Sequence, residues 1–216
     1  MKFKAAIFDM DGLLLDTERV CMQVFQQACD EVQVPFDKTI YLSIIGRNAT
    51  GIEHILRNYY GDNYPAVHQA WRERYNAIVL HQAIPVKDGV IELLEWLKAN
   101  HIPAAVATST KKDVAGIKLK LAQLDHYFDH FTTGCEVEHG KPAPDIYLLA
   151  AERLGIAPQH CLAFEDSNNG VRATVSANMI TFQIPDLTEP DAEILALGHQ
   201  VSPSLHQVLA MLQQQR

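Results

Sequence analysis

Residues 3–17 read FKAAIFDMDGLLLDT, and this segment contains the features that decide the fold. Residues 3–8 are apolar apart from one lysine, which is the pattern of a short strand buried on both faces of a parallel sheet. The strand leads directly into Asp9 and Asp11, two carboxylates separated by a single residue. Ligands of open α/β sheets bind beyond the carboxyl ends of the strands, so we expect these two carboxylates at a ligand site.

Three similar apolar runs follow later in the chain, at residues 102–107, 161–164 and 179–184. Between them, apolar residues recur at helical spacing. Two such sets are Val90, Ile91, Leu94 and Leu97, and then Val114, Ile117, Leu121 and Leu124. Strands that alternate with helices are typical of α/β proteins. The sequence therefore predicts a Rossmann-like parallel sheet with helices on both faces.

Residues 17–85 interrupt this alternation, because they show helical periodicity alone. The segment begins just after the first predicted strand and its loop, where the ligand loops of open α/β sheets lie. We therefore predict a small helical cap domain over residues 17–85, inserted into an α/β core formed by residues 1–16 and 86–216. A cap in this position would cover the ligand site.

Composition and charge exclude several classes of function. The 216 residues are 48% hydrophobic and carry a formal net charge of −8, so a nucleic-acid polymer would be repelled. The apolar runs are far shorter than the roughly 20 residues that cross a bilayer, and the N-terminus lacks the apolar core of a secretory signal. The four cysteines show no CxxC spacing. We expect a cytoplasmic protein that binds a small molecule and has no membrane partner.

Polar residues stand at the end of each of three predicted strands. Asp9 ends the first, Thr108 and Ser109 end the second, and Glu165 and Asp166 end the third. Carboxylates crowded at one sheet edge repel one another unless a cation lies among them, and oxygen ligands suit Mg²⁺. Each motif alone has a plainer interpretation as a turn or a helix N-cap. Their joint occurrence at strand ends favours a magnesium site.

Together the motifs resemble those of the haloacid dehalogenase superfamily, and they occur here in the family's order across residues 9–166. The matching segments are Asp9-Met10-Asp11-Gly12 with the residues to Thr17, then Thr108, then Gly140-Lys141-Pro142, then Phe164-Glu165-Asp166-Ser167. The predicted cap is similar to that of the subgroup containing β-phosphoglucomutase and many sugar-phosphate and nucleotide phosphatases. The resemblance implies a phosphatase of small phosphorylated metabolites.

The resemblance also implies roles for the acidic residues. Asp9 would be the nucleophile that forms an aspartyl phosphate, and Asp11 would be the general acid and base. Asp166 would bind Mg²⁺, joined by Asp9, by the backbone carbonyl of Asp11, and by Glu165 either directly or through water. Four carboxylates, Mg²⁺ and one lysine leave a net negative charge, so without the metal a phosphate dianion would be repelled.

The same resemblance implies three further site positions, and the place of one arginine in the predicted cap suggests a fourth. Thr108 and the backbone of Ser109 would bind phosphoryl oxygens, while Lys141 would pair with Asp9 and the phosphoryl group. Arg47, between two predicted cap helices, would suit a phosphate or a polyhydroxylated group of the substrate. A surface position beside a helix end is an equally good interpretation of Arg47.

Several alternatives remain open at this level. A phosphomutase would use the same aspartyl phosphate, but mutases that resemble β-phosphoglucomutase have a cap histidine where this sequence has Cys21. A dehalogenase needs neither metal nor the second aspartate, so Asp11, Glu165 and Asp166 argue against it. A non-catalytic binding protein on the same fold is the third alternative. Sugar phosphates and nucleoside monophosphates, including pseudouridine 5′-phosphate, are not separated as substrates.

Overall fold

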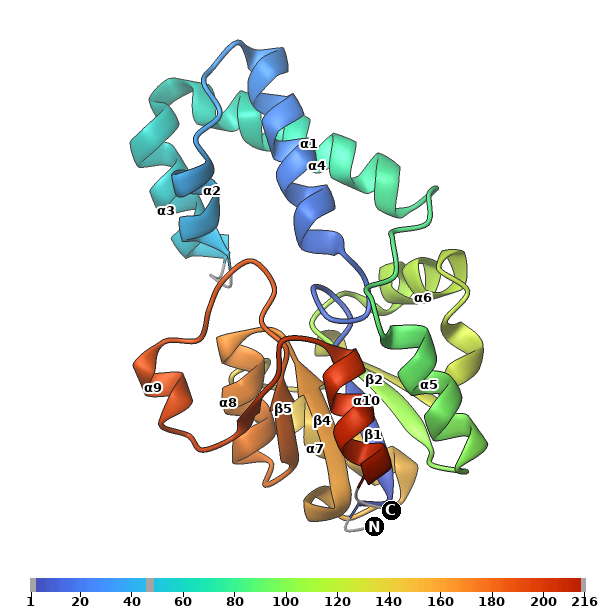
Figure 1. The fold of residues 1–216 in the computed structure, drawn as a ribbon. Coiled ribbons are helices and arrows are strands. Elements are labelled where there is room, and N and C mark those ends of the chain that lie inside the picture. The colour runs from blue at the N-terminus through green and yellow to red at the C-terminus, as the bar shows by residue number, and fades with distance from the viewer. Residues whose placement is uncertain (1–2, 46–48, 215–216) are drawn as a thin grey trace.

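The computed structural model describes residues 3–45 and 49–214. Six parallel strands form one sheet in the order β3-β2-β1-β4-β5-β6 (Figure 1). The strands are β1 (Ala5–Phe8), β2 (Ala104–Thr108), β3 (His130–Thr133), β4 (Cys161–Glu165), β5 (Ile180–Gln183) and β6 (Gln200–Val201). The predicted Rossmann-like sheet is confirmed. Within the described ranges, no helix combines the length and apolar character needed to cross a membrane.

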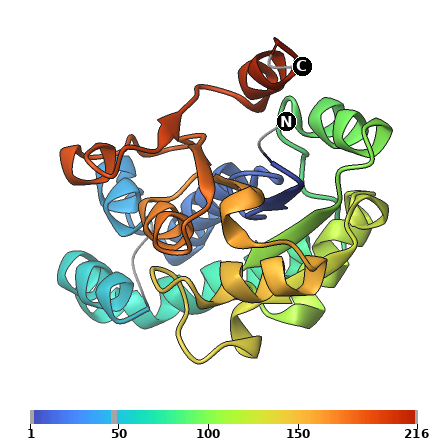
Figure 2. The ribbon, with the colours of Figure 1, turned by 90° about the horizontal axis from the view of Figure 1, so that it is seen from below.

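Helices cover both faces of the sheet because the central strands are apolar on both sides (Figure 2). In β1, Ala6 and Phe8 belong to the core cluster of one face and Ala5 and Ile7 to that of the other. The first face is packed by α5 (Val90–Ala99), α6 (Lys112–Leu121) and α10 (Leu205–Gln214), and the second by α7 (Asp145–Leu154) and α8 (Asn168–Ser176). The ring of Phe8 stacks on that of Phe164 in β4, with centroids 4.6 Å apart.

The remaining core elements are short. They are α9 (Ala192–Leu195) and the single 3₁₀ turns η2 (Asp125–Tyr127), η3 (Gly134–Glu136) and η4 (Pro158–His160). Two members of the apolar sets at helical spacing do not face the core, since Ile91 and Ile117 are 40% and 38% exposed. In α6 the inward positions belong to Ala115, Lys118 and Leu119 instead, so a lysine occupies the place that periodicity gives to an apolar residue.

Between β1 and α5 the described chain contains only helices, which lie above the carboxyl ends of the strands in Figure 1. They are α1 (Thr17–Val32), α2 (Lys38–Ile44), α3 (Ala49–Tyr60), the 3₁₀ turn η1 (Gly61–Asn63) and α4 (Tyr64–Val79). They share a core of their own, in which the Phe25 ring lies 5.4 Å from that of Tyr41 and 5.0 Å from that of Trp71. The division into a cap of residues 17–85 and a core stays a prediction.

The two segments that connect these helices to the sheet run side by side. The Asp16 amide donates to the Pro85 carbonyl at 2.8 Å, and the Lys87 amide donates to the Leu14 carbonyl at 3.0 Å. Leu14 is fully buried in the core of the sheet. The chain thus leaves the sheet for the helices and returns to it at neighbouring points.

Candidate active site

A cavity of about 270 Å³ lies at the carboxyl ends of the strands and contains most of the predicted site residues. Its lining includes Asp9, Asp11, Thr108, Ser109, Lys141 and Asp166 from the sheet side and Glu18 and Ile45 from the helical side. Glu165 does not line the cavity but is fully buried and bonded to Lys141, which does. Arg47 lies outside the described residues, so its predicted contact with substrate stays a prediction.

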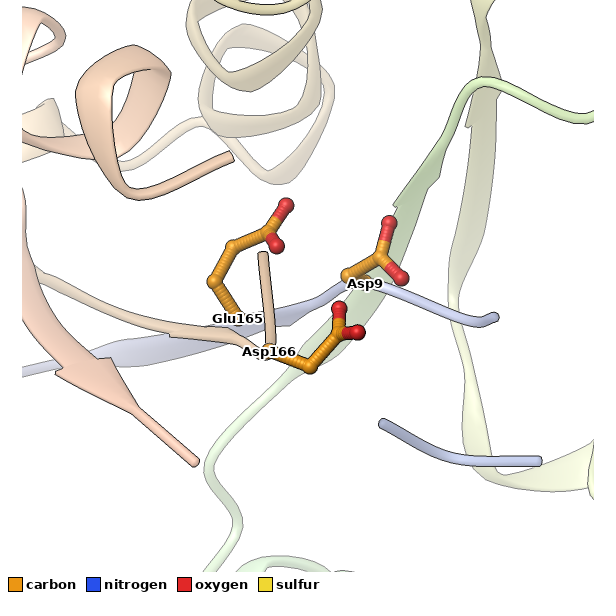
Figure 3. A group of neighbouring side chains, drawn as sticks. All are labelled: Asp9, Glu165 and Asp166. Atoms are coloured by element: carbon orange, nitrogen blue, oxygen red, sulfur yellow. The ribbon is translucent and has the colours of Figure 1, made fainter. Parts of the chain in front are cut away.

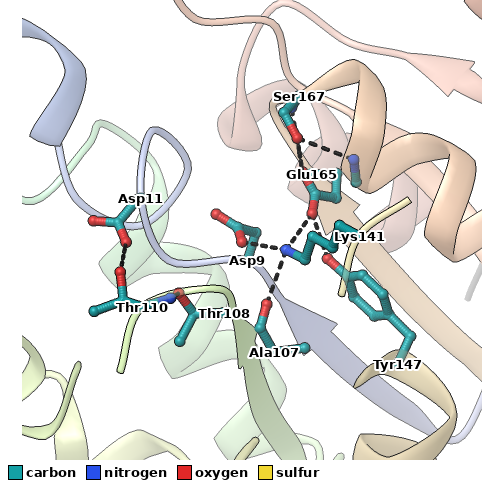
Figure 4. A network of polar contacts seen from close by, with 10 residues as sticks. Asp9, Asp11, Ala107, Thr108, Thr110, Lys141, Tyr147, Glu165 and Ser167 are labelled. Atoms are coloured by element: carbon teal, nitrogen blue, oxygen red, sulfur yellow. Dashed lines mark hydrogen bonds and ion pairs between the residues drawn. The ribbon is translucent and has the colours of Figure 1, made fainter. Parts of the chain in front are cut away.

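Asp9 is fixed at the centre of this arrangement by its place directly after β1. Its backbone amide donates to the Phe164 carbonyl at 3.0 Å, and its carboxylate accepts a hydrogen bond from Lys141 Nζ at 2.5 Å (Figure 4). The same ammonium group donates to Glu165 at 2.6 Å and to the Ala107 carbonyl at 3.1 Å. Burial lowers the pKa of Lys141, but Asp9 and Glu165 outweigh burial and raise it, so the side chain is charged.

Glu165 is the best-anchored carboxylate of the site. Its Oε1 accepts hydrogen bonds from Lys141 and from the Tyr147 hydroxyl, each at 2.6 Å. Its Oε2 accepts from the Ser167 amide at 3.2 Å and the Ser167 hydroxyl at 3.0 Å. Tyr147 could not be identified from the sequence, because it occupies an inward position of α7 that any large side chain could fill. Its buried hydroxyl needs a partner, and Glu165 supplies it.

Asp9, Glu165 and Asp166 together form a cluster that could hold a metal ion (Figure 3). One carboxylate oxygen from each lies within 4.8 Å of the other two. Burial raises the pKa of Asp166, and the charges of Glu165 and Asp9 raise it further. Burial likewise raises the pKa of Asp9, against the opposing charge of Lys141. Such crowded carboxylates are stabilised by a cation, and an all-oxygen donor set fits a hard divalent ion such as Mg²⁺.

Asp11 points away from Lys141 and has partners of its own (Figure 4). Its Oδ2 accepts a hydrogen bond from the Thr110 hydroxyl at 2.6 Å, and its Oδ1 accepts one from Lys118 Nζ at 2.7 Å. Neither partner was predicted from the sequence. Thr110 stands in the same strand-end loop as Thr108 and could have been considered, whereas Lys118 sits in mid-helix and carries no motif.

Thr108 and Ser109 line the cavity beside Asp9. Thr108 is almost fully buried, and its hydroxyl oxygen accepts a hydrogen bond from the Thr110 amide at 3.1 Å, which shapes the loop after β2. Ser109 is exposed on the same loop. Their binding of phosphoryl oxygens stays a prediction, and the loop geometry is compatible with it.

The helical side supplies one acid that the motifs do not include. Glu18, in the first turn of α1, lines the cavity opposite the strand ends. Burial raises its pKa to about 7, and the negative charges of Asp11 and Asp186 contribute to the shift. The cavity is therefore acidic on both sides, which increases its need for a cation.

Two helical glycines give a matched test of the packing beneath Glu165. A Cβ on Gly170 in α8 would lie only 1.8–2.1 Å from the carboxyl carbon and oxygens of Glu165, whereas one on Gly116 in α6 meets nothing within 4 Å. Gly170→Ala should lower the free energy of unfolding by about 2 kcal/mol or more, since Glu165 must leave its partners. Gly116→Ala should raise it by about 0.5–1 kcal/mol through helix propensity. Urea denaturation measures both, and equal shifts would refute the tight packing.

Comparison with known proteins agrees with the motifs. Residues 3–178 match the family model described as haloacid dehalogenase-like hydrolase. A Drosophila melanogaster protein named "Probable pseudouridine-5′-phosphatase" is 37% identical over 197 residues, which cover 86% of this chain and 83% of that protein. The phosphorylated carbohydrates phosphatase of Thermotoga maritima is 33% identical over 186 residues, covering 82% of each chain.

Solved structures agree on the fold. A HAD family hydrolase from Deinococcus radiodurans R1, crystallised with bound phosphate and sodium, superposes with a TM-score of 0.83 at 28% identity. The match covers 98% of this chain and 95% of that chain. The arrangement of helices over the sheet is therefore shared along nearly the whole length of both proteins.

Proposed function

Since this chain belongs to the haloacid dehalogenase-like hydrolases and is a phosphoric monoester hydrolase, we propose that it hydrolyses small phosphate monoesters through a phosphorylated Asp9. The observation that carries the proposal is the position of Asp9, which is bonded to Lys141, lies close to the carboxylate of Asp166 and is followed by Asp11 two residues later. Sugar phosphates and nucleoside monophosphates are the proposed substrate classes, in keeping with the names of the two relatives.

In the first proposed step, a carboxylate oxygen of Asp9 attacks phosphorus and the bond from phosphorus to the leaving oxygen breaks. Asp11, an ion-pair partner of Lys118 in the free site, takes up a proton with the substrate and donates it to that oxygen, so the alcohol departs neutral. Lys141, Thr108 and the backbone of Ser109 stabilise the charge on the equatorial phosphoryl oxygens. Because Lys141 is anchored by Glu165 and the Ala107 carbonyl, its position is set before substrate binds.

In the second step, water attacks the phosphorus of the aspartyl phosphate and gives a proton to Asp11, which releases inorganic phosphate and restores Asp9. One aspartate thus acts as acid and then as base. Separate roles for Asp9 as nucleophile and Asp11 as acid and base are supported by their different hydrogen-bond partners. Asp9 is bonded to Lys141, and Asp11 is bonded to Thr110 and Lys118.

Asp9, Asp166 and the backbone carbonyl of Asp11 would hold Mg²⁺, which supplies charge neutralisation at the phosphoryl oxygens when bound. For Glu165 we favour the water-mediated alternative over direct ligation. Its two oxygens already accept four hydrogen bonds, from Lys141, Tyr147 and the amide and hydroxyl of Ser167. Glu165 would then act mainly by orienting Lys141.

Hydrolysis is favoured over phosphomutase activity by the surroundings of Cys21. Its side chain borders a cavity among the helices, next to Trp71. Burial raises the pKa of the Cys21 thiol to about 11, so the thiol is neutral at physiological pH. A neutral thiol is a poor substitute for the histidine that mutases of this kind have at the matching position.

A substrate panel tests the proposal. Phosphate release is measured with Mg²⁺ from sugar phosphates, nucleoside monophosphates including pseudouridine 5′-phosphate, and 4-nitrophenyl phosphate. We expect kcat/KM for the best metabolite to exceed that for the aryl ester by about tenfold or more, because the cavity contacts its leaving group. No phosphate release across the panel, with conversion of hexose 1-phosphates to 6-phosphates, would establish a mutase instead.

A further inference from the structure

We propose that Lys118 and Tyr75 are positioning residues that set the orientation of the Asp11 carboxylate and link it to the helical segment above the site. The inference rests on the proposed function, in which Asp11 transfers protons to and from substrate. It assigns a role to two residues that belong to none of the motifs.

The contacts form a continuous path from the helices to the acid–base group. Lys118 is only 3% exposed, and its ammonium group donates to Asp11 Oδ1 at 2.7 Å and to the Tyr75 hydroxyl at 3.2 Å. The ammonium also lies 5.4 Å from the centroid of the Tyr75 ring. Tyr75 belongs to α4 and Lys118 to α6, so the path joins the helical segment to the sheet side.

A buried lysine in this place requires a reason beyond packing. Burying an ammonium group is unfavourable unless a counter-charge and hydrogen-bond partners compensate. Burial acts to lower the pKa of Lys118, and Asp11 and Tyr75 more than offset it. The Asp11 carboxylate is the compensating charge, so the two side chains hold each other in place.

The geometry fixes Asp11 more firmly than either contact alone would. Thr110 donates to Oδ2 and Lys118 to Oδ1, so each carboxylate oxygen has its own donor. Rotation about the side-chain bonds of Asp11 would break at least one of these hydrogen bonds. The Tyr75 contact adds a dependence on α4, because a shift of that helix removes one partner of Lys118. Proton transfer, and not substrate binding, is the step that this arrangement controls.

The test compares Lys118→Met with Lys120→Met, which removes an exposed lysine from the same helix. Single-turnover release of the leaving group is measured for an alkyl phosphate, the best metabolite of the panel, and for 4-nitrophenyl phosphate. An alkoxide needs a proton donor, whereas 4-nitrophenolate departs well without one. Lys118→Met should slow the alkyl ester about 100-fold and the aryl ester less than about fivefold, with KM nearly unchanged. Lys120→Met should change neither rate.

Three further variants complete the test. In an Asp11→Asn background, Lys118→Met should add less than about twofold, since the residue it positions is gone. Lys118→Arg should recover part of the lost rate. Tyr75→Phe, which keeps the ring and removes the hydroxyl, should slow release of the leaving group from the alkyl ester about three- to tenfold. This variant tests the same inference if Lys118→Met does not fold.

Equal losses on both esters, a rise in KM alone, or an additive effect with Asp11→Asn would overturn the inference and leave Lys118 as a structural residue. If Lys118→Met does not fold, a wild-type rate for Tyr75→Phe overturns it as well. Wild-type protein that releases phosphate from neither ester would instead refute the proposed function itself, and with it the role given to Asp11.

Discussion

Asp9→Asn should lower kcat for phosphate release by at least about 10⁴-fold, because it removes the nucleophile from a group of residues that act as a unit. The loss should be the same for alkyl and aryl phosphates, since both esters require attack on phosphorus. The fold should survive the change. Lys141 keeps its contacts with Glu165 and the Ala107 carbonyl, and the amide oxygen of asparagine can still accept a hydrogen bond from it.

Phosphate release by stopped assay with purified protein measures the effect, and Asp62→Asn at an exposed position is the matched control. Acid-quenched wild-type protein incubated with substrate should carry one added phosphoryl group by intact mass, and Asp9→Asn none. A variant that retains a tenth of the wild-type rate would show that another group attacks phosphorus.

Removal of divalent cations should lower the rate of phosphate release by about 10³-fold or more, and added Mg²⁺ should restore the rate. The reason is electrostatic: Asp9, Glu165 and Asp166 offer oxygens within 4.8 Å of one another, and Glu18 and Asp11 add negative charge to the same cavity. A phosphate dianion would be repelled from such a site without a cation. Excess chelator followed by Mg²⁺ titration gives the measurement.

A second measurement does not depend on turnover. Ligands that bind only the folded state raise its stability, so Mg²⁺ should increase the thermal unfolding midpoint of the wild type. It should increase that of Asp166→Asn far less, because one of the crowded carboxylates is lost. A monovalent salt at equal ionic strength serves as the control. Full activity in excess chelator, or equal midpoint shifts in both proteins, would contradict a metal site here.

The central part of the fold could be predicted from the sequence because its strands are buried on both faces. Such strands are mostly apolar, and all four predicted runs contain strands of the sheet. β3 reads HFTT and β6 has only two residues, both exposed, so neither has that pattern. They lie at the two edges of the sheet, where β3 is buried only in its second half and β6 not at all, and each strand pairs with a single neighbour.

Some residues of the site could likewise be predicted from the sequence and others could not. Strand-end residues such as Asp9 and Asp166 could be identified because the topology of a parallel sheet gathers strand ends at one edge. Lys118 and Tyr147 could not, since each lies in a helix and acts through a partner on another element. Helical periodicity even argued for the wrong side chain in α6, where Ile117 is exposed and Lys118 faces inward. The packing of α6 against the loop that carries Asp11 determines which of these two side chains faces inward.

The paired connections at Asp16–Pro85 and Leu14–Lys87 have an evolutionary consequence. Because the helical segment departs and returns at neighbouring points, its length and shape are not constrained by the spacing of the strands on either side. Closing a longer or shorter loop across the same two points changes chain entropy only slowly with length. Recombination could therefore exchange one set of helices for another while the sheet and its strand-end residues stay intact, which would let substrate preference diversify separately from the chemistry.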